Sequence, residues 1–358
     1  MKWNKAFIPF TILFVITVLV SVREISKAVY IKEHYTTVSV RMKTEEITED
    51  EVRSALEKEK SVGMTAIPEI TAWSQQNDQE VGNTELGRVV KTSIIVVSGD
   101  ISLTAPMSLL HGNYPYQEDF KGCVIDAETA YQLYGMEDAI GNTLNYKDKE
   151  YYVRGVVKTL SSLLILPGDN ETQYTNLEFI YPDQERGEEL AAGFLLQNDF
   201  PKDYLLIDSN LYGNMQRSFL VLPTWIFYFV ISWIILRFLW KRRRDVKSRT
   251  VVICGAAGMI GVLGYGILLY QYTGNPIYIP EKLIPTRFSD FDYWSAQLLR
   301  MKEQVKNIHY VLPNNRDILL EKVTIQTVPN AISLLLLYLT FLLSCRNLMH
   351  GRETEYRL

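Results

Sequence analysis

The sequence contains little that could support a disulfide framework or a metal site. Only three cysteines occur among its 358 residues, and Cys254 and Cys345 lie within or beside apolar runs. This distribution does not support a set of disulfides. Cys123 lies in a polar region, where we expect a small buried apolar residue rather than a reactive thiol. The four histidines are scattered without the spacing of metal ligands, so we predict no metal site.

The motifs of nucleotide-binding proteins and hydrolases are missing as well. The sequence has no GxxxxGK[ST] loop for ATP and no GxSxG, HExxH or CxxC motif. Asp126 with Glu128, and Glu137 with Asp138, could suggest acid–base pairs, but helix capping and solvated turns explain them better. A net charge of −4, without a basic stripe among aromatic residues, gives no indication of nucleic-acid binding. We therefore predict that the chain is not an enzyme and binds no cofactor.

Long apolar segments are the first positive feature, and they lie at 6–22, 219–240, 251–270 and 331–345. Roughly 20 apolar residues are needed to cross a bilayer as a helix. The fourth segment is short, but Pro329 and its neighbours can extend it because proline is tolerated in a first helical turn. The first segment could instead be a cleaved signal peptide, although its length and the charged residues after it argue against cleavage. We expect four membrane-spanning helices.

Positive charges predict the orientation of these helices. Lys2 and Lys5 precede the first segment, the turn at 241–249 holds six lysines and arginines in nine residues, and three arginines follow the fourth segment. Because such residues collect on the cytoplasmic side, both termini and this turn are predicted to be cytoplasmic. The expected layout is TM1 and a stalk (1–29), an extracytoplasmic domain (30–217), TM2 (218–240), the basic turn (241–249), TM3 (250–271), an external loop (272–328), TM4 (329–346) and a cytoplasmic tail (347–358).

The third predicted span carries a stripe of small residues, namely Gly255, Gly258, Gly261 and Gly264. Small residues at this spacing allow two helix backbones to approach closely in a membrane. The partner could be a neighbouring span or another subunit, and the sequence leaves both open. No acidic residue lies inside any predicted span. This absence argues against an ion-coupled secondary transporter, which usually places ionisable groups there.

The predicted extracytoplasmic domain has the pattern of a mixed α+β fold. Val38, Val40 and Met42 alternate with polar residues, as in a half-buried strand. Thr48 and Glu51 form a plausible capping box for a helix that Gly63 ends. We expect further strands at 64–73 and 93–98. The fold class is therefore an α-helical membrane protein with a large α+β domain between TM1 and TM2.

A more specific pattern follows at 124–157. It contains Val124-Ile125-Asp126, Leu133-Tyr134-Gly135, Glu137-Asp138-Ala139-Ile140-Gly141-Asn142-Thr143-Leu144 and Tyr152-Val153-Arg154-Gly155-Val156-Val157, and Gly112-Asn113-Tyr114-Pro115 lies upstream. This run resembles the periplasmic core domain of MacB-type ABC transporter permeases. The resemblance implies that Gly135, Ile140, Gly141 and Gly155 are structural signature residues, and the glycines serve tight turns.

The order of span, external domain and three further spans also resembles the MacB/FtsX class of permeases. The resemblance implies a bacterial cell-membrane protein that dimerises with itself or another permease, contacts membrane lipids and is powered by a separate cytoplasmic ABC-type ATPase. The possible coupling residues are Arg242, Arg243, Arg244 and Asp245. The family places a coupling helix here and this sequence has only a short turn, so a sensor or accessory protein without an ATPase is the alternative function.

The predicted loop at 272–328 is longer than the family's. Within it, Ser289 can cap an amphipathic helix that runs to about Tyr310, with Phe291, Trp294 and Leu298 on its apolar face. Such a helix can lie at the membrane interface or pack on the external domain, and we favour packing.

Overall fold

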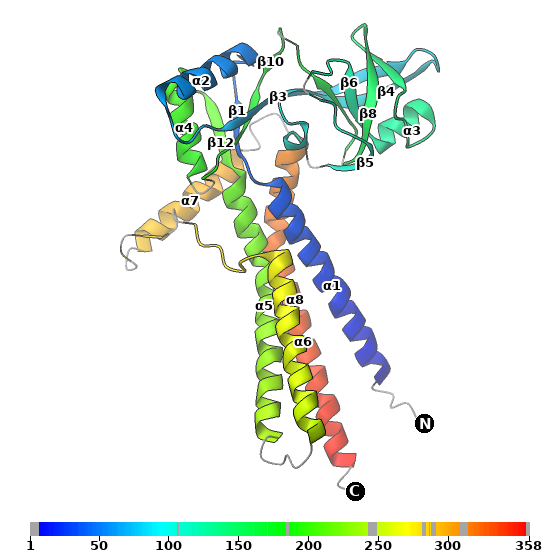
Figure 1. The fold of residues 1–358 in the computed structure, drawn as a ribbon, viewed down its shortest axis with the longest axis vertical. Coiled ribbons are helices and arrows are strands. Elements are labelled where there is room, and N and C mark those ends of the chain that lie inside the picture. Colours follow the sequence, from blue (N-terminus) through cyan, green and yellow to red (C-terminus); the bar gives the residue numbers. More distant parts are fainter. Residues whose placement is uncertain are drawn as a thin grey trace. The chain divides into compact units, whose positions relative to one another are not determined.

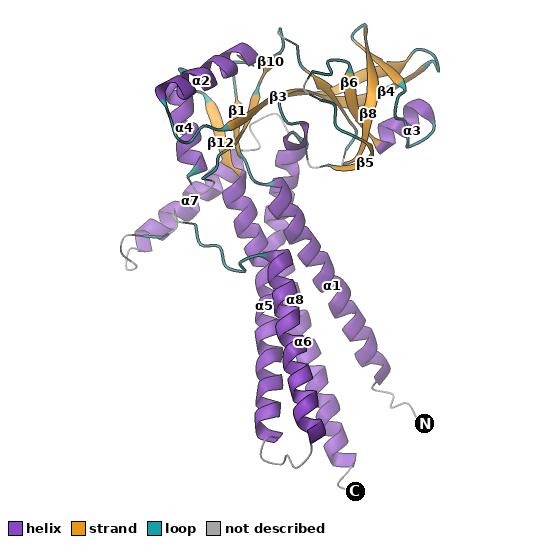
Figure 2. Cartoon of the chain, viewed as in Figure 1, coloured by secondary structure: helices purple, strands orange, loops and turns teal. Residues whose placement is uncertain are grey.

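The computed structural model of the protein describes residues 7–355 except 106, 117, 160, 170, 184–185, 243–248, 281–283, 286, 288–290 and 308–313. The chain divides into two compact units. We call residues 1–33, 212–279 and 322–358 the span unit, and residues 34–211 and 280–321 the domain unit. The span unit consists of long helices, and the domain unit contains the strands (Figures 1 and 2).

Most strands of the domain unit belong to one long sheet (Figure 2). The strands are β1 (Val38–Met42), β2 (Ile47–Thr48), β3 (Glu69–Asn83), β4 (Arg88–Ser98), β5 (Ser108–Gly112), β6 (Gly122–Asp126), β7 (Thr143–Tyr146), β8 (Lys149–Lys158), β9 (Leu163–Pro167), β10 (Gln173–Tyr174), β11 (Asn176–Ile180) and β12 (Tyr204–Asp208).

The strand order in the long sheet is β12-β1-β11-β3-β4-β9-β6-β8-β5. Strand β7 pairs with β3 and β8, while β10 and β2 form a separate pair. The pairing is antiparallel except between β4 and β9 and between β6 and β8.

Helices cover this sheet over two separate cores. Helix α4 (Gly187–Gln197) contacts β1, β11 and β12, and α2 (Glu49–Val62) contributes Val52 and Ala55 to the same core. Helix α3 (Ala127–Tyr134) contacts β4, β6 and β8 over the second core, in which Ile125, Leu133 and Val153 are fully buried. The α+β character predicted for this domain is therefore confirmed.

Several local predictions are confirmed in detail. Both reciprocal hydrogen bonds of a capping box are present between Thr48 and Glu51 at the start of α2. Asp126 caps α3, and Gly135 ends that helix in the left-handed conformation with a φ of +78°. Strands β7 and β8 form a hairpin within the region that resembles the core domain. Cys123 has no exposure, and burial raises the pKa of its thiol, which fits a buried apolar role.

Two strands differ from their predicted bounds. The strand expected at 64–73 begins only at Glu69 and continues to Asn83, and the one expected at 93–98 is the second half of β4. Strands β3 and β4 pair along most of their length. Their polar outer halves show no apolar alternation, so it is the hydrogen bonding between the two strands that holds them extended.

The span unit is built from α1 (Phe7–His34), α5 (Ser209–Arg242), α6 (Arg249–Thr273) and α8 (Asn315–Glu355), and the last residue of α1 and the first residues of α5 and α8 belong to the domain unit. Among the described residues, three helices are long and apolar enough to cross a membrane, at Ile8–His34, Ser209–Arg237 and Asn315–Arg346. The chain is thus a membrane protein with a mixed α+β domain after its first helix. Helix α6 occupies the position of the predicted third span, and that span stays a prediction.

These helices are longer than the apolar segments that predicted them. Pro329, which we expected in a first helical turn, instead lies inside α8, and Pro223 lies inside α5. The position expected for Pro329 was therefore wrong. Helix α8 begins earlier because Asn314 caps it, accepting a hydrogen bond from the backbone N–H of Asp317 at 2.8 Å. The apolar pattern cannot reveal this polar first stretch.

Hydroxyl groups connect three helices of the span unit. The Ser21 hydroxyl on α1 donates to the backbone carbonyl of Thr17 at 2.6 Å and lies 2.8 Å from the Tyr338 hydroxyl on α8. Tyr338 therefore donates to Ser21 and accepts from Thr224 on α5, at 2.9 Å. One turn further along α5, the Tyr228 hydroxyl donates to the backbone carbonyl of Val262 on α6 at 3.3 Å. Such polar bonds are a common means of association between helices in a membrane.

Helix α7 (Phe291–Asn307) belongs to the domain unit. It lies within the predicted amphipathic segment, whose cap Ser289 and last residue Tyr310 are outside the described residues. Its described side chains are exposed or half-buried, and Phe291 is 78% exposed. Packing of this helix on the external domain, which we favour over a position at the membrane interface, stays a prediction.

Candidate functional site: a buried ion-pair network

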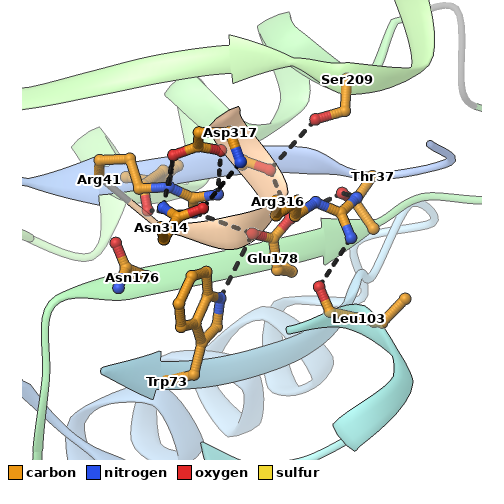
Figure 3. A network of polar contacts seen from close by, with 12 residues as sticks. Thr37, Arg41, Trp73, Leu103, Asn176, Glu178, Ser209, Asn314, Arg316 and Asp317 are labelled. Atoms are coloured by element: carbon orange, nitrogen blue, oxygen red, sulfur yellow. Dashed lines mark hydrogen bonds and ion pairs between the residues drawn. The ribbon is translucent and has the colours of Figure 1, made fainter. Parts of the chain in front are cut away.

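Arg41 lies at the centre of a polar network within the domain unit (Figure 3). It lies on β1, and its side chain has no exposure to solvent. Its Nε and Nη2 donate to the two carboxylate oxygens of Asp317, each at 3.0 Å, and its Nη1 donates to Glu178 at 2.8 Å. The guanidinium also lies 5.0 Å from the centre of the Trp73 ring. A bidentate pair of this kind fixes orientation as well as distance.

Glu178 on β11 is the second fully buried charge. One carboxylate oxygen accepts from Arg41 and from the indole N–H of Trp73 at 3.3 Å. The other accepts from the hydroxyl of Thr37 at 2.7 Å and from that of Ser39. All of these partners donate, so the site is arranged for a carboxylate and not for a carboxylic acid.

The pKa values of both groups favour the charged forms. Burial alone would raise the pKa of Glu178, but the guanidinium groups of Arg316 and Arg41 and the hydroxyls of Ser39 and Thr37 outweigh it, so this pKa lies below its usual value. Burial likewise acts to lower the pKa of Arg41, and its two carboxylate partners raise it further than burial lowers it. Both side chains are therefore ionised at neutral pH.

The first turn of α8 supplies the other half of the network. Asn314 precedes the helix, and its side-chain amide donates to the Asp317 carboxylate at 2.5 Å while its side-chain oxygen caps the helix. Arg316 donates to the backbone carbonyls of Leu103 and His34 at 2.7 and 3.1 Å. It also donates to Thr37 at 2.7 Å. The first turn of α8 is thereby attached to several separate segments of the domain unit.

The four charges balance one another. Arg41 and Glu178 have no exposure, and Arg316 and Asp317 are each 3% exposed, so two cations and two anions are buried together. The Nε of Arg316 lies 3.8 Å from Glu178 and is the one network nitrogen among the described residues that is buried without a hydrogen-bond partner. Separating any charge from this group would leave an uncompensated buried ion, which costs about 3–5 kcal/mol.

The network contains residues from three segments that lie at the ends of long helices in the sequence (Figure 3). Thr37, Ser39 and Arg41 directly follow α1. Ser209 is the first residue of α5, directly after β12, and its hydroxyl lies 3.3 Å from that of Ser39. The first turn of α8 supplies Arg316 and Asp317. Three separate helix ends therefore meet one group of buried charges.

Comparison with known proteins identifies the domain that holds this network. The family description of the MacB-like periplasmic core domain matches residues 10–192, more than half of the chain. The chain belongs to this family. The network residues of β1 and β11 fall inside the matched region, whereas those of α5 and α8 fall outside it.

Two solved structures are similar to about half of the chain. The extracellular domain of the noncanonic ABC-type transporter YknZ from Gram-positive bacteria is 16% identical, with a TM-score of 0.36 over 48% of this chain and 99% of that one. The periplasmic region of MacB from Actinobacillus actinomycetemcomitans is 13% identical, with a TM-score of 0.38 over 50% of this chain and 91% of that one. No curated protein sequence matches the chain.

The signature residues of the core domain lie together around β5 and β8. Gly112 pairs with Gly155, where a β carbon would lie 2.8 Å from the backbone oxygen of Asn113. The backbone N–H of Gly141 donates to the carbonyl of Val153 on β8 at 2.9 Å. A β carbon added to Gly112 would lie 2.6 Å from the side chain of Ile140. Close backbone approach at Gly112 and Gly155 leaves no room for a β carbon. The structural role of the signature residues as a set stays a prediction.

The predicted packing stripe on α6 stays a prediction. Added β carbons at Gly258, Gly261 and Gly264 would meet no described atom within 4 Å. Gly266, which the sequence did not single out, is instead the glycine of α6 that lies against the Tyr228 hydroxyl. These three positions are therefore open on the described part of this chain, whereas Gly255 is buried.

The predicted coupling residues lie mostly outside the described residues. Arg242 is the last residue of α5, while Arg243, Arg244 and Asp245 are not described. Their role as coupling residues stays a prediction.

No charged residue of the network was predicted from the sequence. One local signal was present, because Asn314 followed by Asp317 has the spacing of a helix start. The alternation in β1 was interpreted as a half-buried strand, yet all five of its residues are buried. A charge on the polar face of a strand usually points to water, and nothing local shows that Arg41 meets an aspartate far away in the chain.

Proposed function

We propose that the chain is the transmembrane, permease-type subunit of a MacB/FtsX-like ABC transport or mechanotransmission system. A separate cytoplasmic ATPase powers it, and the chain carries out no chemistry of its own. Support comes from the family match, from the three candidate spans and from the network at their domain ends. The proposed location is the bacterial cell membrane, with both termini cytoplasmic, as the distribution of lysine and arginine predicts.

The observation that carries this proposal is the attachment of three apolar helices to one buried, neutral group of charges. A helix that shifted alone would pull Asp317 away from Arg41, or would disrupt the hydroxyls that follow α1. Because an unpaired buried charge is costly, the helix ends and the sheet move together. Movement of the spans is thus transmitted to the core domain without a substrate passing between them.

Purification of the chain in mild detergent tests this proposal. We expect an ABC-type ATPase to co-purify, and we expect a variant with Arg242, Arg243 and Arg244 replaced by alanine to lose most of it. A topology reporter fused to the C-terminus controls for inversion, because loss of these charges can also change orientation. A purification that never recovers an ATPase would overturn the proposal.

One observation favours a second function, a membrane-anchored sensor or accessory protein without an ATPase. Only residues 243–248 separate α5 from α6, where a MacB/FtsX-type permease is expected to place a coupling helix. Under this alternative the alanine variant keeps the same partners and the same phenotype as the wild type.

A further inference from the structure

Arg217, near the start of α5, is a buried cation without a carboxylate partner. It is 7% exposed, and its Nη1 donates to the backbone carbonyl of Thr273, the last residue of α6. Its Nε is buried and has no hydrogen-bond partner, and no described carboxylate lies within ion-pair distance. A helix C-terminus attracts a cation, but it leaves this donor unsatisfied. The position thus calls for an additional acceptor.

A second cation approaches the same place. A β carbon added to Gly274 would lie 3.1 Å from Nη1 of Arg217 and 4.0 Å from Nζ of Lys32 on α1. Lys32 is exposed and also lacks an ion pair among the described residues, as does its exposed neighbour Glu33. Two cations beside the half-buried Gly274 suit an anion with several oxygen atoms, such as a phosphate group.

An apolar cavity lies in the span unit, and its lining includes the residue that precedes Thr273, the hydrogen-bond acceptor of Arg217. Its volume is about 390 Å³, and α1, α5, α6 and α8 all line it. Ligand pockets have volumes of roughly 300–1,000 Å³, and an engineered cavity of about 150 Å³ already holds benzene. The hydroxyls of Ser21 and Tyr338 on its wall are bonded to each other, and that of Thr17 donates to the carbonyl of Leu13. Most of the other lining side chains are aliphatic or aromatic, so the wall suits hydrocarbon.

The cavity and the cations adjoin along the chain. Tyr272 lines the cavity, and the next residue, Thr273, accepts the hydrogen bond of Arg217. On α1, Ile25 lines the cavity and Lys32 follows about 10 Å further along the helix, at ~1.5 Å per residue. An apolar chain and an anionic head joined in one molecule match this arrangement.

We propose that this is a binding site for one anionic phospholipid. One acyl chain occupies the cavity between the helices, and the phosphate lies between Arg217 and Lys32, where it accepts a hydrogen bond from the Nε of Arg217. The bound lipid connects α1 with α5 and α6. The site is independent of the ATPase partner proposed above.

Native mass spectrometry of the purified full chain, with phosphatidylglycerol or phosphatidylcholine added, tests the site. We expect the wild type to retain phosphatidylglycerol preferentially. Arg217→Gln and Lys32→Gln each lower this retention about tenfold and remove the preference, because a charge-assisted hydrogen bond is lost. Leu268→Trp narrows the cavity and lowers the retention of both lipids. Arg346→Gln removes an exposed cation at the far end of α8 and leaves retention unchanged.

Retention that is unaffected by both glutamine variants would overturn the proposal. Retention of inorganic phosphate equal to that of phosphatidylglycerol would also overturn it, since the occupant would then be a free anion. If Arg217→Gln does not fold, Lys32→Gln decides the outcome alone, because the Lys32 side chain is exposed and its loss does not disturb packing.

Discussion

Asp317 shows most clearly how much a single charge matters here. Replacing it by asparagine keeps its shape but leaves two buried guanidinium groups with one carboxylate. We expect Asp317→Asn to destabilise the domain by about 3–5 kcal/mol. This corresponds to a fall in Tm of roughly 10 °C for a domain of this size, measured by thermal unfolding in detergent.

An exposed ion pair of the same domain provides the control. Lys149 and Asp169 lie 2.9 Å apart, but both side chains are more than half exposed. Asp169→Asn is expected to cost less than about 1 kcal/mol, because water screens the pair. If the two asparagine variants melted at the same temperature, the network would not hold the domain together.

Glu178 predicts a dependence of stability on pH. Its pKa is lowered in the folded state, by Arg316 and Arg41 among others, against the effect of burial. The stabilisation is therefore complete above the unfolded pKa of about 4.3 and is lost as the pH falls through the folded pKa. We expect the difference in Tm between the wild type and Glu178→Gln to be large at pH 6 and to shrink towards pH 3. A constant difference across this range would contradict the assignment.

At the scale of the element, the caps of α2 and α3 differ in the hydrogen bonds that they accept. Thr48 caps the exposed start of α2, whereas Asp126 caps α3 and also accepts a hydrogen bond from the backbone N–H of Leu163 on β9 at 2.8 Å. Thr48→Ala should cost about 1 kcal/mol. Asp126→Ala should cost about 3 kcal/mol, because it also leaves a buried N–H unsatisfied. Equal losses in chemical denaturation would show that Asp126 only caps its helix.

Elements with a strong local signal could be predicted from the sequence. The capping box of α2, the cap and final glycine of α3, and the hairpin of β7 and β8 all follow from neighbouring residues. The early start of α8 did not follow from the apolar pattern, because its first stretch is polar although its cap at Asn314 is local. The outer halves of β3 and β4 did not follow, because distant pairing holds them. The same reason hides the network, whose partners Arg41 and Asp317 are separated by most of the chain.

For the whole molecule, the predicted topology can be tested by thiol labelling in intact cells. In a chain whose cysteines are replaced by alanine, Lys91→Cys on β4 should react with a membrane-impermeant reagent, because Lys91 is 68% exposed and β4 is predicted to be external. Lys247→Cys, in the basic turn, should react only after the cells are lysed. Reaction of Lys247→Cys in intact cells would contradict four spans with cytoplasmic ends.

The proposed transmission of span movement to the core domain is best tested by amide hydrogen exchange in a complex with the proposed ATPase. The informative variant combines Arg41→Met with Asp317→Leu, which removes one charge of each sign and leaves Arg316 with Glu178, so that the fold is kept. In the wild type, we expect ATP to change the exchange of β1 and β11. In the variant, ATP should still be hydrolysed but this change should be lost. The same change in both proteins would contradict transmission through the buried network.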